Sequence, residues 1–389
     1  MTRKTLALGT ALFVAGSAAG VGHASAEPGV FDDRIVFGQS AAFEGPAAAL
    51  GIGMRQGIQA AFDEANAKGG VNGRKLELIG YNDGYEPELS IQNTKKLIEQ
   101  DQVFGLIGPV GTPTSKATQP VATQAGVPFI GPFTGAGFLR KPENDNVVNV
   151  RATYDQETET WIEYLTKERK FERIAILYQD DSFGRVGLAG VQKAMEKRGL
   201  SLVAEGTYKR NTTAVKSALL KIRKGKPQAI VMVGAYKPCA EFIKLAKKTG
   251  MKADFVNISF VGSKALAKEL GDKGAGVIVS QVVPFPWDES IPLVKSYQSA
   301  LKAHDAKAEP GFVSLEGYMV GKLVIMALNE MGPDVTRKGL TETIARIGGF
   351  DLGGVTLTYG KGDNQGMDDV FMTEIQADGS FRPIGSPAS

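Results

Sequence analysis

The sequence predicts an α/β fold made of two similar lobes, each a parallel sheet flanked by helices. Short buried apolar runs alternate with longer segments whose apolar residues recur at helical spacing. The alternation begins near residue 34, is interrupted by a polar stretch at 141–146, and then begins again. A chain of 389 residues also has room for two domains of ordinary size.

Apolar runs and helical spacing define the first lobe. The expected strands are 34–38, 75–81, 103–108 and 127–130. The expected helices run from about Met54 to Ala65, over 89–99, and from Thr112 onward. We expect Thr112 to cap the third helix and Pro113 to occupy its first position, where a missing N–H costs nothing. Strands and helices that alternate in this way require right-handed crossovers and a parallel sheet.

The same pattern defines the second lobe. The expected helices are 155–169, 184–198, 213–223 and 238–249, and the expected strands are 173–178, 201–207, 229–233, 254–259 and 276–282. Further helices near 290–303, 312–330 and 336–346 are followed by strands within 353–376. Because ligands of such sheets bind beyond the carboxyl ends of the strands, the cleft between the lobes is the expected binding site.

The first 26 residues have the layout of a secretory signal peptide. Arg3 and Lys4 precede an apolar run that ends near Val21. Ala24-Ser25-Ala26 is an A-x-A site, so we expect cleavage before Glu27. The alternative is a membrane anchor, but the apolar run is rich in Gly and Ala and shorter than the roughly 20 residues that a span needs.

Charge and composition exclude several functions. The chain has 45 Lys and Arg against 42 Asp and Glu, and the signal peptide takes two basic residues and no acid, which lowers the net charge from +3 to +1. Such a balance gives no reason to expect nucleic-acid binding. Cys239 is the single cysteine, and of two histidines only His304 remains after cleavage. An exported chain without a disulfide fits a bacterial periplasm.

No recognisable catalytic motif is present. Gly51, Gly53 and Gly57 come close to G-x-G-x-x-G but lie too far past a strand, and we interpret them as positions of close helix packing. The basic run Lys221 to Lys226 is interpreted as a solvated helix face. The shortage of His and Cys argues against a metal site. We therefore expect no enzymatic activity, no catalytic residue, no metal and no cofactor.

Glycine and hydroxyl residues are dense just after the strands of the first lobe. Gly111-Thr112 and Thr134-Gly135 can present backbone N–H groups and hydroxyls, and a helix that begins at Thr112 adds the positive end of its dipole. This combination suits a ligand carboxylate, although Thr112 alone would serve equally as a helix cap. The aromatic residues of the cleft segments can be either core or ligand wall: Phe133, Phe183, Tyr236 and Phe260.

Nearly the whole mature chain also carries a series of short motifs. They are Phe43-Glu44-Gly45-Pro46, the run from Asn66 to Leu76, Tyr81-Asn82-Asp83, Leu106-Ile107-Gly108-Pro109, Gly131-Pro132, Tyr178 with Phe183-Gly184, and Glu316-Gly317-Tyr318. The Lys-Gly-Gly-Val-Asn-Gly-Arg stretch, 68–74, is the most specific. In these motifs the sequence resembles the periplasmic leucine/isoleucine/valine-binding proteins, the type I solute-binding proteins of ABC importers.

The resemblance implies a type I periplasmic-binding-protein fold whose two lobes, joined by three crossings, close on a ligand like a clamshell. The N-terminal lobe would comprise 27–151 and 285–361, and the C-terminal lobe 152–284 and 362–389. The expected ligand-binding residues line the cleft between them: Leu50, Thr112, Phe133, Thr134, Gly135, Phe183, Tyr236 and Ser259.

Within that set, the resemblance assigns roles to the residues of the first lobe. Thr112 matches the hydroxyl that holds the ligand carboxylate. Phe133 and Gly135 match backbone partners on the next loop, with Thr134 beside them. Leu50 departs from the family, which often has an aromatic residue there.

Residues of the second lobe define the other end of the ligand. Phe183 and Tyr236 match aromatic contacts. Ser259 stands where the amino-acid binders carry an acid that pairs with the ligand ammonium, and a buried ammonium without a carboxylate is costly. An α-amino acid would need a replacement acid: Asp180, Asp181 or Glu316. We therefore expect a small carboxylate with a hydrophobic or aromatic body and no free α-amine, with an amino acid as the next candidate.

The expected function is that of the substrate-binding component of an ABC importer. The partners would be a small-molecule carboxylate and the permease subunits of the inner membrane, with no nucleic acid and no direct membrane insertion. We expect a monomer that is exported to the periplasm by its cleaved signal peptide. A ligand-sensing protein on the same fold, which feeds a signalling partner, is the alternative.

Overall fold

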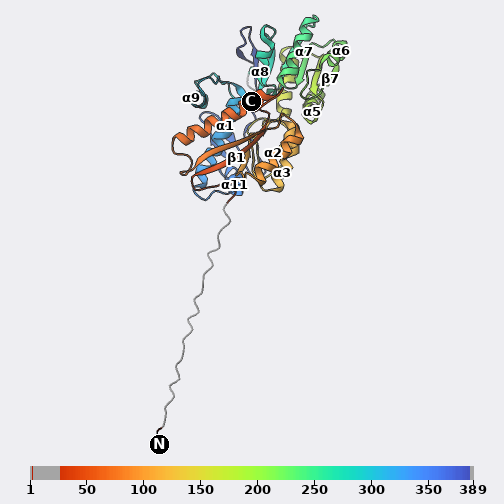
Figure 1. Ribbon diagram of the computed structural model, residues 1–389. Helices are drawn as coiled ribbons and strands as arrows, with labels where there is room; N and C mark the ends of the chain where they lie inside the picture. Colours follow the sequence, from red (N-terminus) through yellow and green to blue (C-terminus); the bar gives the residue numbers. More distant parts are fainter. Residues whose placement is uncertain (1, 3–26, 386–389) are drawn as a thin grey trace.

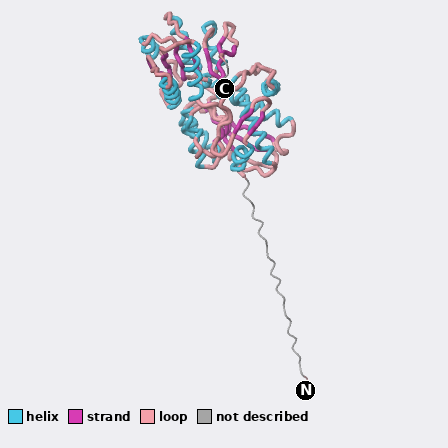
Figure 2. The backbone as a smooth tube through the Cα atoms, turned by 180° about the vertical axis from the view of Figure 1, so that it is seen from behind, coloured by secondary structure: helices cyan, strands magenta, loops and turns pink. Residues whose placement is uncertain are grey.

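The computed structural model describes residues 2 and 27–385, and it has two lobes. The predicted signal peptide, residues 1–26, lies outside the described residues apart from Thr2. In both lobes a sheet lies between layers of helices (Figure 1, Figure 2). This is the α/β architecture that the alternating pattern predicts.

The N-terminal lobe contains a five-stranded sheet in the order β2-β1-β3-β4-β5. All of its pairings are parallel. The strands are β1 (Arg34–Ala41), β2 (Lys75–Asn82), β3 (Gly105–Ile107), β4 (Phe129–Ile130) and β5 (Val147–Val148). The intervening helices are α1 (Ala48–Ala67), α2 (Pro87–Glu99) and α3 (Thr112–Gln124), followed by the 3-10 turn η1 (Gly137–Arg140).

Later segments complete this lobe. They are α9 (Pro292–His304), α10 (Phe312–Met331), α11 (Arg337–Ile347) and the hairpin of β11 (Gly349–Asp351) and β12 (Thr356–Thr358). Helix α10 packs closely on α1: a Cβ atom on Gly57 would lie 1.9 Å from the Ser314 carbonyl oxygen, and one on Gly317 would lie 2.2 Å from the Met54 carbonyl oxygen. At Gly57, the interpretation of the α1 glycines as packing positions is therefore confirmed.

One described helix is long and apolar enough to cross a membrane. It is α10, and 78% of its apolar window is buried inside the protein, where the helix forms part of the core.

The C-terminal lobe contains a seven-stranded sheet in the order β14-β13-β10-β9-β8-β6-β7. Its strands are β6 (Ile174–Gln179), β7 (Ala204–Tyr208), β8 (Ala229–Val233), β9 (Asp254–Asn257), β10 (Ile278–Gln281), β13 (Phe371–Ile375) and β14 (Phe381–Ile384). Strands β6 to β10 are parallel, and the last two strands are antiparallel.

Helices cover both faces of this sheet. They are α4 (Tyr154–Glu163), α5 (Ser182–Glu196), α6 (Lys216–Lys224), α7 (Tyr236–Lys248) and α8 (Ser263–Leu270). Three shorter segments are η2 (Tyr164–Glu168), η3 (Ser259–Val261) and η4 (Gly271–Lys273). The single helix expected over 155–169 is in fact α4 followed by the π-helical turn η2. The strand expected to reach Ser259 ends at Asn257, and Ser259 opens η3.

The chain passes between the two sheets three times, after β5, after β10 and after β12. The first and third passages lie side by side. The Asn149 N–H donates to the Asn364 carbonyl at 2.8 Å, and the Gly366 N–H donates to the Asn149 carbonyl at 2.9 Å. The residues at which one lobe ends and the other begins remain a prediction.

Candidate ligand-binding site

Two threonine hydroxyls meet at the start of α3. Thr112 Oγ1 and Thr134 Oγ1 are 2.7 Å apart, and both side chains are buried. The expectation that Thr112 caps α3 was wrong: Gly111 is the cap residue and Thr112 is the first residue of the helix. Gly111 has φ +106°, a conformation open mainly to glycine, so the chain turns one residue earlier than expected. The Thr112 hydroxyl is therefore not used for capping.

Tyr154 lies beside these threonines, at the first residue of α4. A Cβ atom on Gly135 would lie 2.6 Å from Tyr154 Cδ1, so the tyrosine ring packs directly on that glycine. The Tyr154 hydroxyl is buried and lacks a hydrogen-bond partner among the described residues. Burial raises the pKa of Tyr154, while the charge of Arg151 and the nearby hydroxyls of Thr134 and Thr112 offset part of that rise. The Tyr154 hydroxyl thus lies beside both threonines without a well-formed hydrogen bond to either. An acceptor placed between Tyr154 and the two threonines would complete this group.

Aromatic rings from both lobes contact one another next to these hydroxyls. Phe260 is at the centre, with ring centroids 4.6 Å from Phe183, 5.4 Å from Phe133 and 5.8 Å from Tyr85. Phe183 also lies 5.5 Å from Tyr154. All of these rings are buried. The first lobe supplies Tyr85 and Phe133, and the second supplies Phe183 and Phe260, so the two lobes meet through this aromatic cluster.

An ion pair lies buried in the same interface. Arg151, in the first passage between the lobes, donates from Nε and Nη2 to the two carboxylate oxygens of Glu316 at 2.8 and 2.7 Å. The exposed fractions of the two side chains are 1% and 3%. Burial lowers the pKa of Arg151, but the charge and hydrogen bonds of Glu316 outweigh that effect and raise it above its usual value. The Arg151 guanidinium also lies 4.2 Å from the centre of the Phe133 ring.

Ser259 joins this ion pair to a second buried acid. Arg151 Nη1 donates to Ser259 Oγ at 3.1 Å, and Ser259 in turn donates to Glu157 from its hydroxyl at 2.8 Å and from its backbone N–H at 2.9 Å. The Ser280 hydroxyl donates to Glu157 at 2.5 Å. Burial raises the pKa of Glu157, and the charge of Arg151 together with these hydrogen bonds offsets part of that rise.

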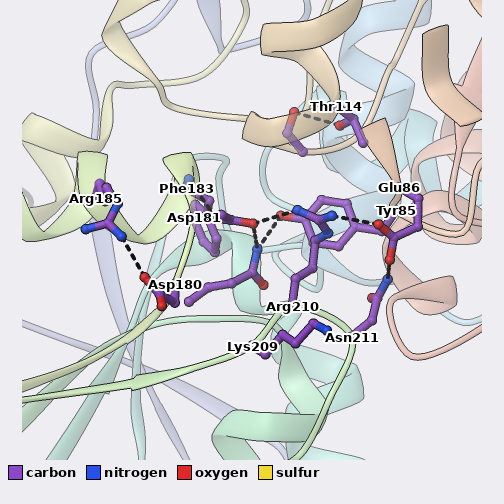
Figure 3. Close-up of polar contacts among 12 residues, drawn as sticks. Tyr85, Glu86, Thr114, Asp180, Asp181, Phe183, Arg185, Lys209, Arg210 and Asn211 are labelled. Carbon is purple, nitrogen blue, oxygen red and sulfur yellow. Dashed lines mark hydrogen bonds and ion pairs between the residues drawn. The ribbon is translucent and has the colours of Figure 1, made fainter. Parts of the chain in front are cut away.

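The acids considered as replacements at Ser259 all have partners. Glu316 is bonded to Arg151, and Asp180 pairs with Arg185 at 2.7 Å on the surface. Asp181 caps α5 by accepting from the Phe183 N–H at 3.0 Å, and its other oxygen accepts from Arg210 at 3.0 Å (Figure 3). None of the three is left free to hold an ammonium group.

Leu50 and Tyr236 lie at a further stretch of the same interface. The Tyr236 hydroxyl on α7 accepts from the Ala49 N–H on α1 at 3.4 Å. A Cβ atom on Gly262 would lie 2.6 Å from Leu50 Cδ2. All eight predicted site residues are thus at or near the contact between the lobes, while their role as ligand contacts remains a prediction.

The lobes are closed on each other at the aromatic cluster. A cavity of about 10 Å³ is lined there by Phe133, Arg151, Ser259 and Glu316, among others. A larger cavity of about 430 Å³ opens at the edge of the interface, beside Leu50 and Gly262. A ligand of amino-acid size can enter the inner site only when the lobes separate.

Sequence reasoning missed Arg151, Tyr154 and Glu157 as members of this site. All three follow β5, a strand of two residues that the apolar pattern did not predict. Had Val147-Val148 been identified as a strand, the polar residues just beyond it would have been placed at the cleft by the same rule as Thr112.

The described residues contain no group of three or more His, Cys, Asp and Glu side chains placed to hold a metal ion. Cys239 is buried in α7, and burial raises the pKa of its thiol.

Comparison with known proteins identifies the class. A sequence profile described as "Periplasmic binding protein" matches residues 34–380. The chain therefore belongs to the periplasmic binding protein family, whose members are non-catalytic ligand-binding proteins of the periplasm.

Individual relatives support this membership. The chain is 25% identical over 334 residues to "Leu/Ile/Val-binding protein homolog 7" of Brucella abortus (strain 2308), covering 82% of each chain. It is 22% identical over 272 residues to the "Leu/Ile/Val-binding protein" of Escherichia coli (strain K12), covering 70% of this chain and 73% of that one. The crystal structure of a possible leucine/isoleucine/valine-binding protein from Rhodopirellula baltica SH 1 is similar, with a TM-score of 0.86, 36% identity, and coverage of 93% and 98%.

Proposed function

We propose that this protein is the substrate-binding component of an ABC importer, and that its ligand is a small carboxylate with a hydrophobic or aromatic body and no α-amine. The observation that carries the proposal is the group of buried hydroxyls of Thr112, Thr134 and Tyr154 next to rings supplied by both lobes. The protein would bind the solute between its lobes in the periplasm and deliver it to a membrane permease.

The hydroxyl group suits the carboxylate end. The first backbone N–H groups of α3 have no acceptor within the helix, and the positive end of the helix dipole lies there. A carboxylate oxygen placed at this end would accept from the Thr112 hydroxyl and from the Tyr154 hydroxyl, which otherwise stays buried without a partner. Hydrogen bonds to a charged group of this kind are the strong ones.

The acids near Ser259 argue against an ammonium group. Glu316 already has both oxygens on Arg151, and Glu157 already accepts three hydrogen bonds from Ser259 and Ser280. The Arg151 guanidinium already donates to Ser259 at 3.1 Å, so a ligand ammonium beside Ser259 would lie close to this positive charge. A second cation there would be repelled and would lose its hydration without gaining a free carboxylate.

The aromatic cluster suits the body of the ligand. Phe133 on one lobe and Phe183 and Phe260 on the other would lie against a hydrophobic or aromatic group of the solute. Each ring that leaves water on closure favours the closed form. The ligand would shift the population from open to closed because its contacts with both lobes exist only in the closed form.

Titration calorimetry with matched ligand pairs tests this proposal. L-leucine is compared with 4-methylpentanoate, which is leucine without its amine, and L-phenylalanine with 3-phenylpropanoate. We expect the deaminated acid of at least one pair to bind about tenfold or more tightly than its amino acid, because only the amino acid must desolvate an ammonium group. Tight binding of leucine with no binding of 4-methylpentanoate would refute the proposal. That result would instead favour a branched-chain amino acid as the ligand, as in the names of the relatives.

A variant pair on one helix tests the carboxylate end. Thr112→Val removes the hydroxyl at nearly constant volume and should weaken binding of the acid by about tenfold or more, because a hydrogen bond to a charged group is lost. Thr118→Val is the matched control, since the Thr118 hydroxyl donates to the Thr114 carbonyl of its own helix at 2.9 Å. Equal affinities of the two variants would contradict the role of Thr112.

A further inference from the structure

Glu86 of the N-terminal lobe is bonded through both carboxylate oxygens to the C-terminal lobe. Arg210 Nη2 donates to Glu86 Oε2 at 2.6 Å, and Asn211 Nδ2 donates to Glu86 Oε1 at 2.7 Å. The Asn211 amide also donates to the Gly84 carbonyl at 3.0 Å. Glu86 is the residue before α2, but its side chain does not cap that helix. Its charge is directed to the other lobe instead (Figure 3).

Arg210 is fixed within its own lobe by a second carboxylate. Its Nη1 donates to Asp181 Oδ2 at 3.0 Å, and Gln179 donates to the same oxygen at 2.7 Å. Arg210 thus lies between an acid of each lobe, and the exposed fractions of the Arg210 and Glu86 side chains are 21% and 40%. The bond to Asp181 lies within one lobe and does not require the other lobe, so it would limit the freedom that Arg210 loses on closure.

These contacts lie directly over the aromatic cluster. Tyr85, the neighbour of Glu86, has its ring centre 5.9 Å from the Arg210 guanidinium, and its hydroxyl accepts from Gln179 at 3.3 Å. Asp181, which Arg210 holds, also caps the helix that carries Phe183. The Glu86–Arg210 ion pair and the contacts of the aromatic cluster therefore form together when the lobes meet.

We propose that Glu86, Arg210 and Asn211 form an ionic latch that sets the equilibrium between open and closed lobes independently of the ligand. The latch rests on the proposed clamshell function but not on the identity of the solute. Because its contacts involve no part of the ligand, the latch would contribute to closure in the same way whichever solute is bound. Arg210 is a positioning residue in this scheme and touches no part of the ligand in it.

The chain offers a matched control. Lys264 and Glu309 also form an ion pair between the lobes, at 2.5 Å, but their side chains are 45% and 74% exposed. Among residues 27–385, no second acid pairs with Lys264. An exposed single pair is screened by water and contributes little. Both pairs join a carboxylate of the N-terminal lobe to a cation of the C-terminal lobe. They differ in the exposure of the cation, in its second acid partner and in the additional Asn211 hydrogen bond to Glu86.

The latch is tested without ligand by single-molecule energy transfer between labels on the two lobes. Leu220 and Lys338 are exposed and lie on different lobes, and Cys239 is buried, so cysteines placed at the first two positions accept labels selectively. We expect Glu86→Gln and Arg210→Gln each to lower the ratio of closed to open molecules roughly tenfold at low salt, because charge-assisted hydrogen bonds are lost. The double variant should have nearly the same ratio of closed to open molecules as either single variant, since each single substitution already breaks the same ion pair.

Salt and the control pair separate the latch from general effects. Raising the ionic strength should reduce the difference between wild type and Glu86→Gln. Glu309→Gln should leave the closed fraction nearly unchanged. An unchanged closed fraction in Glu86→Gln, or an equal fall in Glu309→Gln, would overturn the latch. Thermal melts of all variants report whether any change reflects loss of folding. Because no ligand is used, failure of the ligand proposal leaves this result intact.

Discussion

Glu316→Gln tests the energetics of the ion pair at the centre of the lobe interface. The substitution leaves the buried Arg151 guanidinium without its paired carboxylate. Arg151 keeps its bond to Ser259 at 3.1 Å, the Phe133 ring, the more distant charge of Glu157 and one hydrogen bond to the new amide oxygen. Removing one partner of a buried pair costs about 3–5 kcal/mol, far more than the pair contributes relative to apolar residues. We expect a loss in the free energy of unfolding near the lower end of that range, because Gln still accepts one hydrogen bond.

Urea unfolding, followed by circular dichroism and by tryptophan fluorescence, measures this loss when the two transitions coincide. The double variant Arg151→Met with Glu316→Leu should recover part of the stability, since neither member of the pair is left buried alone, while Glu157 loses the offsetting charge of Arg151. Glu342→Gln is the control: its pair with Lys338 lies on the surface and should contribute less than about 1 kcal/mol. A loss below about 1 kcal/mol in Glu316→Gln would refute the reasoning, because it would mean that water reaches Arg151.

Three further predictions concern single side chains. Burial raises the pKa of Glu157, so the ionised form of this side chain destabilises the folded protein. Glu157→Gln should therefore be more stable than wild type at pH 8. That advantage should vanish as the pH falls below about 4.5, the ordinary pKa of a glutamate, because Glu157 is then protonated in both the folded and the unfolded protein. Urea unfolding at pH 8 and at low pH measures the difference in stability. Gly135→Ala should lower the unfolding free energy by about 1–3 kcal/mol because its methyl group would meet Tyr154, whereas Gly137→Ala, with open space around it, should not change it in thermal melts. The Cys239 thiol should resist maleimide in the native protein and react in urea, as mass spectrometry can show; rapid native labelling would contradict its burial.

Much of the fold could be predicted because the strands of a parallel sheet are continuous apolar runs. β6 and β8 are buried at every position, and both were predicted. The strand β5 was not, since Val147-Val148 is too short to show any period. The π-helical turn after α4 was missed for a related reason: the apolar spacing through Leu165 is compatible with one continuous helix.

The site could be predicted only where one segment determines it. Thr112 and Phe133 follow strands directly, so their place in the cleft is a local property of the sequence. Arg151 and Glu316 are 165 residues apart, and nothing in either segment indicates their pairing. The same holds for Ser259 and Glu157, which lie 102 residues apart in the sequence and meet within the C-terminal lobe. The missing acid at Ser259 was visible in the sequence, but the side chains that surround it were not.

The order of strands in the C-terminal lobe also bears on how the protein is made. Residues 371–384 supply β13 and β14, which cover the side of β10 that faces away from β9. During synthesis and export, β10 keeps an open edge until almost the whole chain is available, and open edges recruit other strands. Chains truncated before residue 371 should therefore aggregate. Chaperones that delay folding should matter more for the C-terminal lobe than for the N-terminal lobe.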